Sequence, residues 1–524
     1  MTATSTQARP TAVVHQRSAV ITAGVLGLVL CWALLMPPGS GPDEPGHLVR
    51  SGAVVRGEFG DSGTFELPDR YRVPEPGCYA FDPTTPVSCA ADVPAAGETV
   101  ALPSRSGEYP PWGHLTFGLP SGLPGLRPIW WARLGGAIVS ALLVGWALRE
   151  ACGTRRSLAA ATLVGITPMA WSTFGTVNPS SIAIAGSVAL WVGLVVGDGN
   201  RHRVGWLTAV GWAALALPRR DGLIWTCIAL AVALAATDRS VATWWRSLHR
   251  GAQVTVATST LMAIVWAVTS ESRASRLAAL APLLVVAGEG VRWLMAAPIE
   301  RSRRFGVGAA GAVVAAVGTI VLLRNRPGGW DTDLAVAIVE QTGNNLIEAI
   351  GVLGWLDTRV PFLAVVIWLM LIGGLFAASA IAGRRTIATA SILVAVIVLT
   401  SWVFELYQGN TSGLYWQGRY SIPLLTGVPI LLASRPTDLP AVEQRIAGAA
   451  TFGSLIVLNI AAWAAARRFG AGTTGTFLPW RWDTIHQPVH PLALLAVHAA
   501  LSLGLAVVVV GGPTVSTRRA PASR

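Results

Sequence analysis

Long apolar runs separated by polar turns dominate the chain from Ser18 to Gly511. A membrane-spanning helix needs about 20 mostly apolar residues. Backbone groups in lipid must be satisfied within the structure, so unalternating runs of this length predict helices and not barrel strands. The pattern therefore predicts an all-α polytopic membrane protein. Its transmembrane helices, about fourteen in number, are expected at 18–36, 129–148, 157–176, 180–197, 204–217, 222–237, 251–270, 277–298, 305–323, 362–383, 386–403, 421–434, 446–466 and 491–511.

The polar segments between these runs predict the topology. Every short connection that fourteen crossings place inside carries arginine, as the positive-inside rule requires. Both termini are then cytoplasmic, and the protein is a multi-pass protein of the cell membrane. The predicted units are a tail at 1–17, one helix at 18–36, an extracytoplasmic loop at 37–128, helices two to nine at 129–323, an extracytoplasmic segment at 324–361, helices ten to fourteen at 362–511 with outer segments 404–420 and 467–490, and a tail at 512–524.

Composition supports the membrane interpretation. The 524 residues are 52% hydrophobic and only 13% charged, whereas soluble domains carry roughly 25% charged residues. The net charge is +12, and all 39 basic residues are arginine. This balance suits membrane lipids with anionic headgroups and phosphate-bearing lipid substrates. Nucleic acid is not expected as a partner, because no basic stripe lies on a soluble domain.

Two of the five cysteines, Cys78 and Cys89, share the large polar loop. They are disulfide candidates if that loop faces an oxidising compartment. No cysteine or histidine spacing typical of a metal site is present, so no metal is expected.

Adjacent carboxylates, Asp43 and Glu44, follow the first apolar run by a few residues. Partial desolvation at a membrane edge can raise a carboxyl pKa into a useful range. Asp43 is also a suitable N-cap for a helix over about 44–56, which would place His47 one turn away. Two interpretations therefore stay open, a catalytic pair and a capped amphipathic helix on the membrane surface.

Later polar motifs also have a functional and a structural interpretation. Tyr109 lies in an EYPPWGH segment that is typical of a membrane interface. Arg219 and Arg220 interrupt an apolar stretch, and arginine suits bidentate phosphate contacts, although a solvated turn is the simpler explanation. Gln417 and Arg419 precede the run at 421–434, where they would bind phosphate or anchor a helix end.

The order of these motifs resembles a known family. PDEPGH, YPPW, VNPSS, PRRDGLIW, GVLGWLDT and WQGRYSIPLL follow one another as in the bacterial membrane proteins grouped as domain of unknown function 2142. The resemblance covers roughly residues 18–435. Those proteins in turn resemble GT-C membrane glycosyltransferases, which take a sugar from a polyprenyl phosphate on the outer face. At the Asn-Pro motif this chain has Ser180 where the family usually has an acidic residue, so the turn at Asn178 is expected to cap the helix that follows, and no catalytic role is assigned to it.

The resemblance implies a mechanism and partners. Asp43 or Glu44 would be the base that deprotonates an acceptor hydroxyl, and His47 would orient a carboxylate or bind the sugar. One or more of the arginines at 219, 220 and 419 would hold the lipid phosphate. The implied partners are a polyprenyl-phosphate-linked sugar donor and an envelope glycan or lipid acceptor. Some relatives of this superfold use a divalent metal, but the carboxylates here are too few and scattered to predict one.

Two other functions remain open at this stage. A lipid or polysaccharide transporter would place ionisable residues near the membrane midplane and use inverted repeats. Here the charges gather at helix ends, and no inverted repeat is found, which favours an enzyme. The third interpretation is a non-catalytic partner in the assembly of the cell envelope.

Overall fold

A computed structural model provides the structure of the chain. It describes residues 10–60, 63–91, 93, 97–197, 201–270, 276, 278–296, 331–435, 439–484 and 486–511. The predicted span at 305–323, the tail at 512–524 and residues 1–9 of the predicted N-terminal tail lie outside these ranges.

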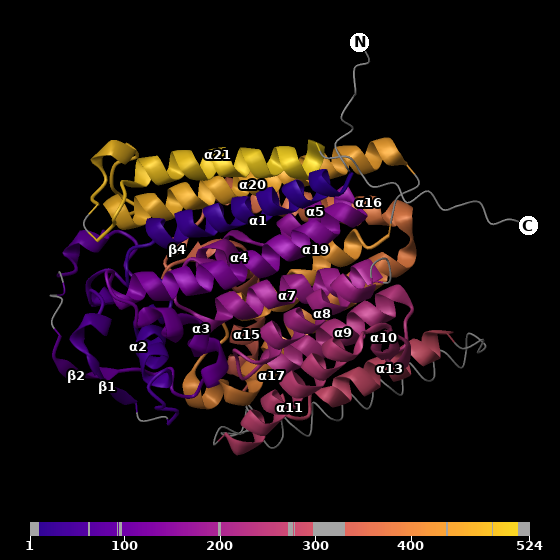
Figure 1. Ribbon diagram of the computed structural model, residues 1–524, viewed down its shortest axis with the longest axis horizontal. Coiled ribbons are helices and arrows are strands. Elements are labelled where there is room, and N and C mark those ends of the chain that lie inside the picture. The colour runs from indigo at the N-terminus through magenta and orange to yellow at the C-terminus, as the bar shows by residue number, and fades with distance from the viewer. Residues whose placement is uncertain are drawn as a thin grey trace, which may run out of the picture.

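A bundle of long helices forms the body of the molecule (Figure 1). Within the described ranges, eight helices are long and apolar enough to cross a membrane. They are α1 (Pro10–Leu35), α4 (Pro128–Thr154), α7 (Pro179–Val196), α11 (Arg250–Thr269), α16 (Phe362–Ala382), α17 (Arg384–Ser412), α20 (Pro440–Ala471) and α21 (Pro491–Gly511). Helix α1 packs between α4 and α21, and α4 packs against α7.

Two further spans are interrupted. The run expected at 157–176 divides into α5 (Arg156–Gly165) and α6 (Pro168–Phe174), bent by 75°. The run at 222–237 forms α9 (Gly222–Thr237), which is followed by α10 (Val241–Ser247) after a 98° bend. The described residues thus hold eight spans, or up to ten with both bent pairs. The expected number of about fourteen is not confirmed, partly because α8 (Arg201–Ala216) and α13 (Pro282–Ala296) are short.

The prediction of a span at 421–434 is wrong. This stretch consists of three short helices, η5 (Gly418–Ser421), α18 (Ile422–Leu425) and α19 (Gly427–Leu432). Its prolines remove backbone donors that a continuous helix would need. A Cβ on Gly427 would lie 2.3 Å from the Trp191 ring, so only glycine allows this approach. The Trp191 indole donates to the Pro423 carbonyl at 2.9 Å and satisfies part of the interrupted backbone.

A small α/β unit covers one end of the bundle, which we call the loop end (Figure 1). The elements are α2 (Glu44–Val54), β1 (Thr64–Pro68), η1 (Asp69–Tyr71), η2 (Pro76–Cys78), η3 (Val87–Cys89), β2 (Thr99–Pro103) and α3 (Pro111–Ser121). Strands β1 and β2 pair antiparallel, with Phe65 opposite Leu102. Both side chains pack with Leu48 of α2 in an apolar cluster separate from the main core. Cys78 and Cys89 form a disulfide in this unit.

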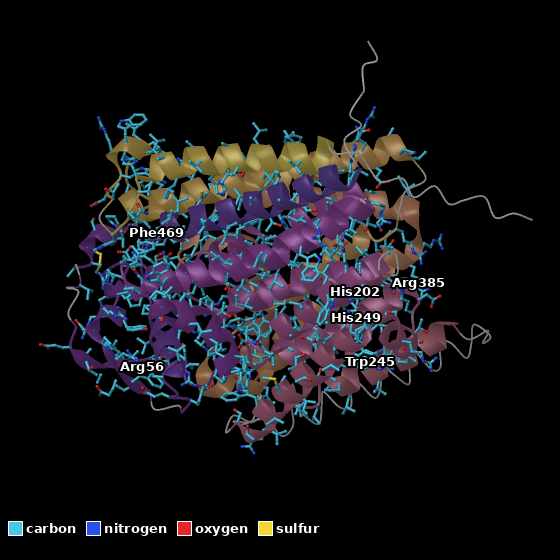
Figure 2. The ribbon with its side chains drawn as sticks, in the orientation of Figure 1. Arg56, His202, Trp245, His249, Arg385 and Phe469 are labelled. Atoms are coloured by element: carbon cyan, nitrogen blue, oxygen red, sulfur yellow. A yellow bond between two sulfur atoms is a disulfide. The ribbon has the colours of Figure 1, made fainter. Side chains whose placement is uncertain are left out.

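Later segments also contribute to the loop end. Helix α15 (Thr332–Gly351) leads into a two-stranded hairpin, β3 (Val352–Leu353) and β4 (Thr358–Arg359), and η6 (Pro479–Arg481) follows α20. The fold is therefore not the strictly all-α fold that the sequence predicted, because it contains two small sheets. Figure 2 shows Arg56 at the loop end and Phe469 on α20, with His202, His249 and Arg385 toward the opposite end. Candidate chemistry and this polar unit thus occupy the same end of the bundle.

Candidate active site

An ion pair joins the first polar motif to the last one. Arg419 Nη2 donates to Asp43 Oδ2 at 2.7 Å, across 376 residues of sequence. The Asp43 side chain is 52% exposed, whereas that of Arg419 is only 2% exposed. Asp43 precedes α2 in a left-handed conformation with φ 57° and makes no side-chain cap bond, so the N-cap hydrogen bond expected of it is not formed. Such a backbone is uncommon outside glycine, and it leaves this carboxylate free to face Arg419.

The Arg419 guanidinium has hydrogen-bond donors that the described part of the chain does not use. Within the described residues, its Nε and Nη1 atoms are buried without a hydrogen-bond partner. Unpaired buried donors are costly, and each in a native structure calls for an explanation. A guanidinium is suited to planar, bidentate contacts with phosphate or carboxylate. The free donors beside Asp43 therefore form a preorganised place for an anionic group.

The second arginine site is the turn between α8 and α9. Arg219 donates from Nε and Nη2 to Asp221 at 2.9 and 3.2 Å, and from Nη1 to Ser180 Oγ at 2.7 Å. Its guanidinium carbon lies 4.8 Å from the Tyr420 ring centroid and 5.7 Å from that of Tyr109. Arg219 is thus held by three hydrogen bonds, and its charged guanidinium lies between two aromatic rings.

The neighbouring Arg220 is held less firmly. It pairs with Glu108, whose side chain is 53% exposed. Both arginines line a cavity of about 200 Å³, and Tyr109 and Asp221 line it as well. Aromatic side chains form most of its remaining wall, namely Trp225, Phe404, Tyr407, Tyr415, Trp416 and Tyr420. This combination of cations and flat apolar rings fits a phosphate attached to a sugar or to an isoprenoid.

His47 lies one turn along α2 from Asp43, as the spacing predicts. Its ring packs edge-on against Tyr109, with the ring centroids 5.1 Å apart. Burial, followed by the charges of Arg419 and Arg219, lowers the pKa of His47 to about 3. His47 is therefore neutral at physiological pH and is available as a hydrogen-bonding group, not as a cation.

Glu44 occupies a different environment. It is fully buried and pairs with Arg133 of α4 through two bonds, at 2.6 and 2.8 Å. Its oxygens also accept from the backbone N–H groups of Gly39, Gly41 and Val177. No free lone pair faces a substrate. We therefore correct the expectation that Glu44 serves as a base, and we assign it a structural role.

Arg133 completes this buried assembly, which we call the Arg133–Glu44 knot. Besides Glu44, it donates to three main-chain carbonyls at the end of α1, those of Ala33, Met36 and Pro37. The carbonyls at the end of a helix lack intrahelical partners, and the Pro37 carbonyl also accepts from Ser40. The knot therefore fixes the path of the chain just before Asp43.

The Asn-Pro turn, which the sequence predicts to be a helix cap, supports both halves of the site. Asn178 Nδ2 donates to the Pro42 carbonyl at 3.1 Å, and Asn178 Oδ1 caps α7 by accepting from Ser180 N. Ser180 in turn accepts the bond from Arg219. The cap on α7 is as the sequence predicted, whereas the contacts with the Pro42 carbonyl and with Arg219 depend on packing that the sequence does not indicate.

The GWLD motif also has a structural role. Asp357 pairs with the buried Arg468 of α20 at 2.8 Å, and Trp355 Nε1 donates to the Gly39 carbonyl at 3.0 Å. Arg468 further donates to three carbonyls of the disulfide loop, those of Tyr79, Asp82 and Thr85. These bonds hold the loop end together around the segment that leads to Asp43.

Gln417 lies outside the aromatic cavity. Its backbone carbonyl accepts from Tyr420 N at the start of η5, and its Oε1 is buried without a partner within the described residues. The structure thus links Asp43 to Arg419 and His47 to Tyr109, and it places Tyr109, Arg219 and Arg220 on the aromatic cavity. Across the described ranges, no group of three or more His, Cys, Asp or Glu side chains is arranged to hold a metal ion.

The fold and this site define a polytopic helical membrane protein with a polar centre at one end. The chain belongs to the family of predicted membrane proteins designated DUF2142, whose profile matches residues 26–428. A comparison with curated proteins finds no sequence that matches.

Two solved structures are similar to this chain, both of ArnT from Cupriavidus metallidurans. They are the apo state, at 15% identity, and the state bound to undecaprenyl phosphate, at 16% identity. Each match covers 96% of this chain and 77% of ArnT, with a TM-score of 0.39.

Proposed function

We propose that this protein is a membrane glycosyltransferase that moves a sugar from a polyprenyl-phosphate donor to a cell-envelope acceptor on the outer face of the membrane. The observation that carries the proposal is the half-exposed carboxylate of Asp43, held 2.7 Å from a buried arginine with two unused donors. A base and an anion site in contact are what glycosyl transfer from a phosphate requires.

The acceptor hydroxyl binds beside Asp43 in this mechanism. Asp43 takes its proton while the oxygen attacks the anomeric carbon of the donor sugar. The new carbon–oxygen bond forms as the bond from that carbon to the phosphate oxygen breaks, through a transition state with oxocarbenium character. A direct displacement of this kind inverts the anomeric configuration.

The leaving polyprenyl phosphate gains negative charge as the bond breaks. Arg419 offers Nε and Nη1 to it, and Arg220 can exchange its exposed partner Glu108 for a phosphate oxygen. Preorganised cations aimed at developing charge lower the barrier because they need no reorganisation. Arg219 contributes a fixed positive field, since its own donors are already engaged.

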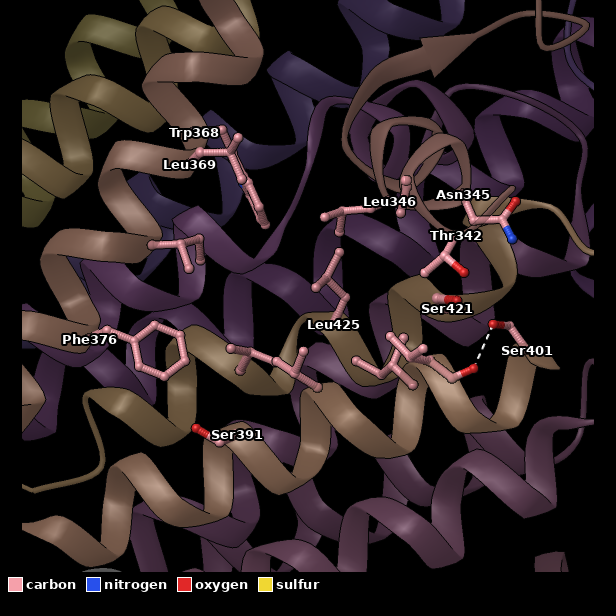
Figure 3. Close-up of a pocket in the computed structure, with 17 residues that line it drawn as sticks. Thr342, Asn345, Leu346, Trp368, Leu369, Phe376, Ser391, Ser401, Ser421 and Leu425 are labelled. Atoms are coloured by element: carbon pink, nitrogen blue, oxygen red, sulfur yellow. Dashed lines mark hydrogen bonds between the residues drawn. The ribbon is translucent and has the colours of Figure 1, made fainter. Parts of the chain in front are cut away.

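A second, apolar cavity of about 430 Å³ suits the isoprenoid chain. It lies between α15, α16, α17 and the short helices α18 and α19 (Figure 3). Thr342, Asn345, Ser401 and Ser421 gather at one end, and the rest of the labelled wall is mostly apolar. Ser421 is two residues from Arg419, so the polar end of this cavity begins near the proposed phosphate site.

The test is transfer of radiolabelled sugar from polyprenyl-phosphate donors in membranes that carry the wild-type protein or Asp43→Asn. Glu66→Gln serves as the matched control, because Glu66 is an exposed carboxylate in the same unit. Transfer that requires Asp43 but not Glu66 supports the proposal. Absence of transfer from every donor, with folded protein present, would instead favour a transporter or an assembly partner.

A further inference from the structure

Two buried histidines meet behind the proposed site. His47 Nδ1 lies 3.3 Å from His114 Nε2, and His114 Nδ1 lies 3.4 Å from the Pro110 carbonyl oxygen. His47 is 1% exposed and His114 is fully buried. The three groups form a chain from the start of α3 to α2, which we call the histidine relay.

The direction of the relay follows from the chemistry of its far end. A carbonyl oxygen only accepts hydrogen bonds, so His114 Nδ1 must carry the hydrogen. A neutral imidazole has a single N–H, so His114 Nε2 holds a lone pair. That lone pair accepts from His47 Nδ1, which must therefore be the protonated nitrogen of His47. The remaining nitrogen, His47 Nε2, is left as an acceptor.

The surroundings of both rings shift their pKa values in the direction that favours the neutral form. Burial lowers the pKa of His114 well below its usual range, and the neighbouring His47 ring and the charge of Arg50 lower it further. Burial also lowers the pKa of His47, with Arg419 and Arg219 adding to the effect. Two imidazolium rings in contact would repel each other without a carboxylate between them.

The His47 ring lies against a residue of the proposed site. The His47 ring is in edge contact with Tyr109, which lines the cavity beside Arg219. In the described part of the chain, His47 Nε2 has no hydrogen-bond partner among the contacts of the structure. His47 Nε2 accepts a hydrogen bond but does not donate one, and the nearby arginines are donors only. This nitrogen is therefore suited to a ligand hydroxyl, which can donate to it.

We propose that His114 is a positioning residue that holds His47 in the Nδ1–H tautomer, so that His47 Nε2 accepts a hydrogen bond from a substrate hydroxyl next to Asp43. The tautomer is a property of the protein alone. The substrate contact rests on the glycosyltransferase function proposed above. The proton removed in the reaction still goes to Asp43, and His47 orients the hydroxyl.

The tautomers can be measured directly by 15N NMR of histidine-labelled protein in lipid nanodiscs, with His47→Gln and His114→Gln used to assign the signals. We expect both rings to carry hydrogen on Nδ1. In His114→Phe the acceptor for His47 is lost, and the His47 signal should move to the Nε2–H form. In His114→Gln the amide oxygen replaces the lost nitrogen, and the His47 tautomer should be retained.

Sugar transfer gives the second readout. His114→Phe should reduce transfer roughly tenfold, the value of one well-placed hydrogen bond, and His114→Gln should restore most of it. At the other ring, His47→Gln retains an acceptor near the position of Nε2, whereas His47→Asn does not. We therefore expect His47→Gln to be the more active of the two.

Three results test the tautomer of His47 and the role of His114. An Nε2–H signal from wild-type His47 would overturn the relay, whatever the activity. Equal transfer by His114→Phe and His114→Gln, with the His47 tautomer unchanged in both, would overturn the role of His114. If the wild type transfers no sugar, the proposed function fails, and the NMR signals still decide whether His114 sets the tautomer. If His114→Phe does not fold, the His47 pair and His114→Gln supply the comparison.

Discussion

Asp43 and Glu44 are adjacent in sequence, and each pairs with a distant arginine, yet their surroundings differ completely. The Glu44–Arg133 pair is closed, with exposures of 0% and 1% and with every carboxylate oxygen bonded to fixed donors. In the Asp43–Arg419 pair the carboxylate is 52% exposed, and the arginine retains two unused donors.

The difference teaches how to separate a structural ion pair from a functional one. A buried pair whose groups are all satisfied is expensive to break and offers nothing to a ligand. A pair with one exposed partner and unsatisfied donors can exchange its internal contacts for a substrate. The criterion is the number of unused hydrogen-bonding positions, and not the distance between the charges.

Asp43→Asn tests the open pair and should have the largest effect. Asparagine keeps the shape and an acceptor for Arg419 but cannot take a proton. We expect transfer to fall by about 10²–10⁴-fold, the usual contribution of a general base. The thermal midpoint in detergent should also fall, because the buried Arg419 loses its carboxylate partner, so transfer is compared at equal amounts of folded protein. Full activity in this variant would remove Asp43 from the mechanism.

Glu44→Gln and Arg133→Gln test the closed pair. Each leaves an uncompensated charge in a buried position, which costs about 3–5 kcal/mol of unfolding free energy. The measurement is thermal unfolding of the purified protein, with Glu66→Gln as the control. Wild-type stability together with lost transfer in Glu44→Gln would reverse our assignment and return Glu44 to the chemistry.

A third pair, Asp357–Arg468, extends the comparison. It is as buried as the Arg133–Glu44 knot, and its arginine likewise has three carbonyl partners. The carboxylates differ, because Glu44 also accepts from three backbone N–H groups, whereas Asp357 accepts from the Thr358 hydroxyl. We expect Asp357→Asn to cost about 1.5–3 kcal/mol, the range for hydrogen bonds to charged groups. Limited proteolysis of the disulfide loop should detect the change first. A loss as large as that of Glu44→Gln would mean that the backbone donors to Glu44 contribute little.

Glu108→Gln should have the smallest effect on stability. Its partner Arg220 lies at the cavity, but the carboxylate is 53% exposed, and such pairs are worth less than about 1 kcal/mol. Release of Arg220 should also lower the KM for the phosphate donor in the transfer assay. An unchanged KM would indicate that Arg220 does not contact the phosphate.

The sequence predicted the helical membrane fold and the motifs of the site. It predicted less well how the helices and these motifs pack together. Runs of apolar residues located the unbroken spans, and the spacing of Asp43 and His47 anticipated their helix. The break at 421–434 was missed, because hydropathy alone does not register the prolines or the approach of Gly427 to Trp191. Hydropathy likewise counted α8 and α13 as spans, although both are short.

The two carboxylates could not be told apart from the sequence. The partner of Glu44 is a single arginine in an apolar helix 89 residues away, and nothing local indicates the pairing. His114 was visible within the EYPPWGH segment, but its contact with His47 depends on how α2 and α3 pack. Tertiary contacts of this kind decide which polar side chain is used for structure.

The Arg133–Glu44 knot has a consequence for biogenesis. Arg133 lies in the second turn of α4, and an arginine within a spanning helix costs up to about 2.5–3.5 kcal/mol on insertion, the value for the centre of the bilayer. In this chain the charge of Arg133 is neutralised only when the end of α1 and the Glu44 segment pack against α4. Membrane integration of α4 is thereby coupled to folding of the segment that precedes it, and we expect the first two spans to mature as one unit during synthesis.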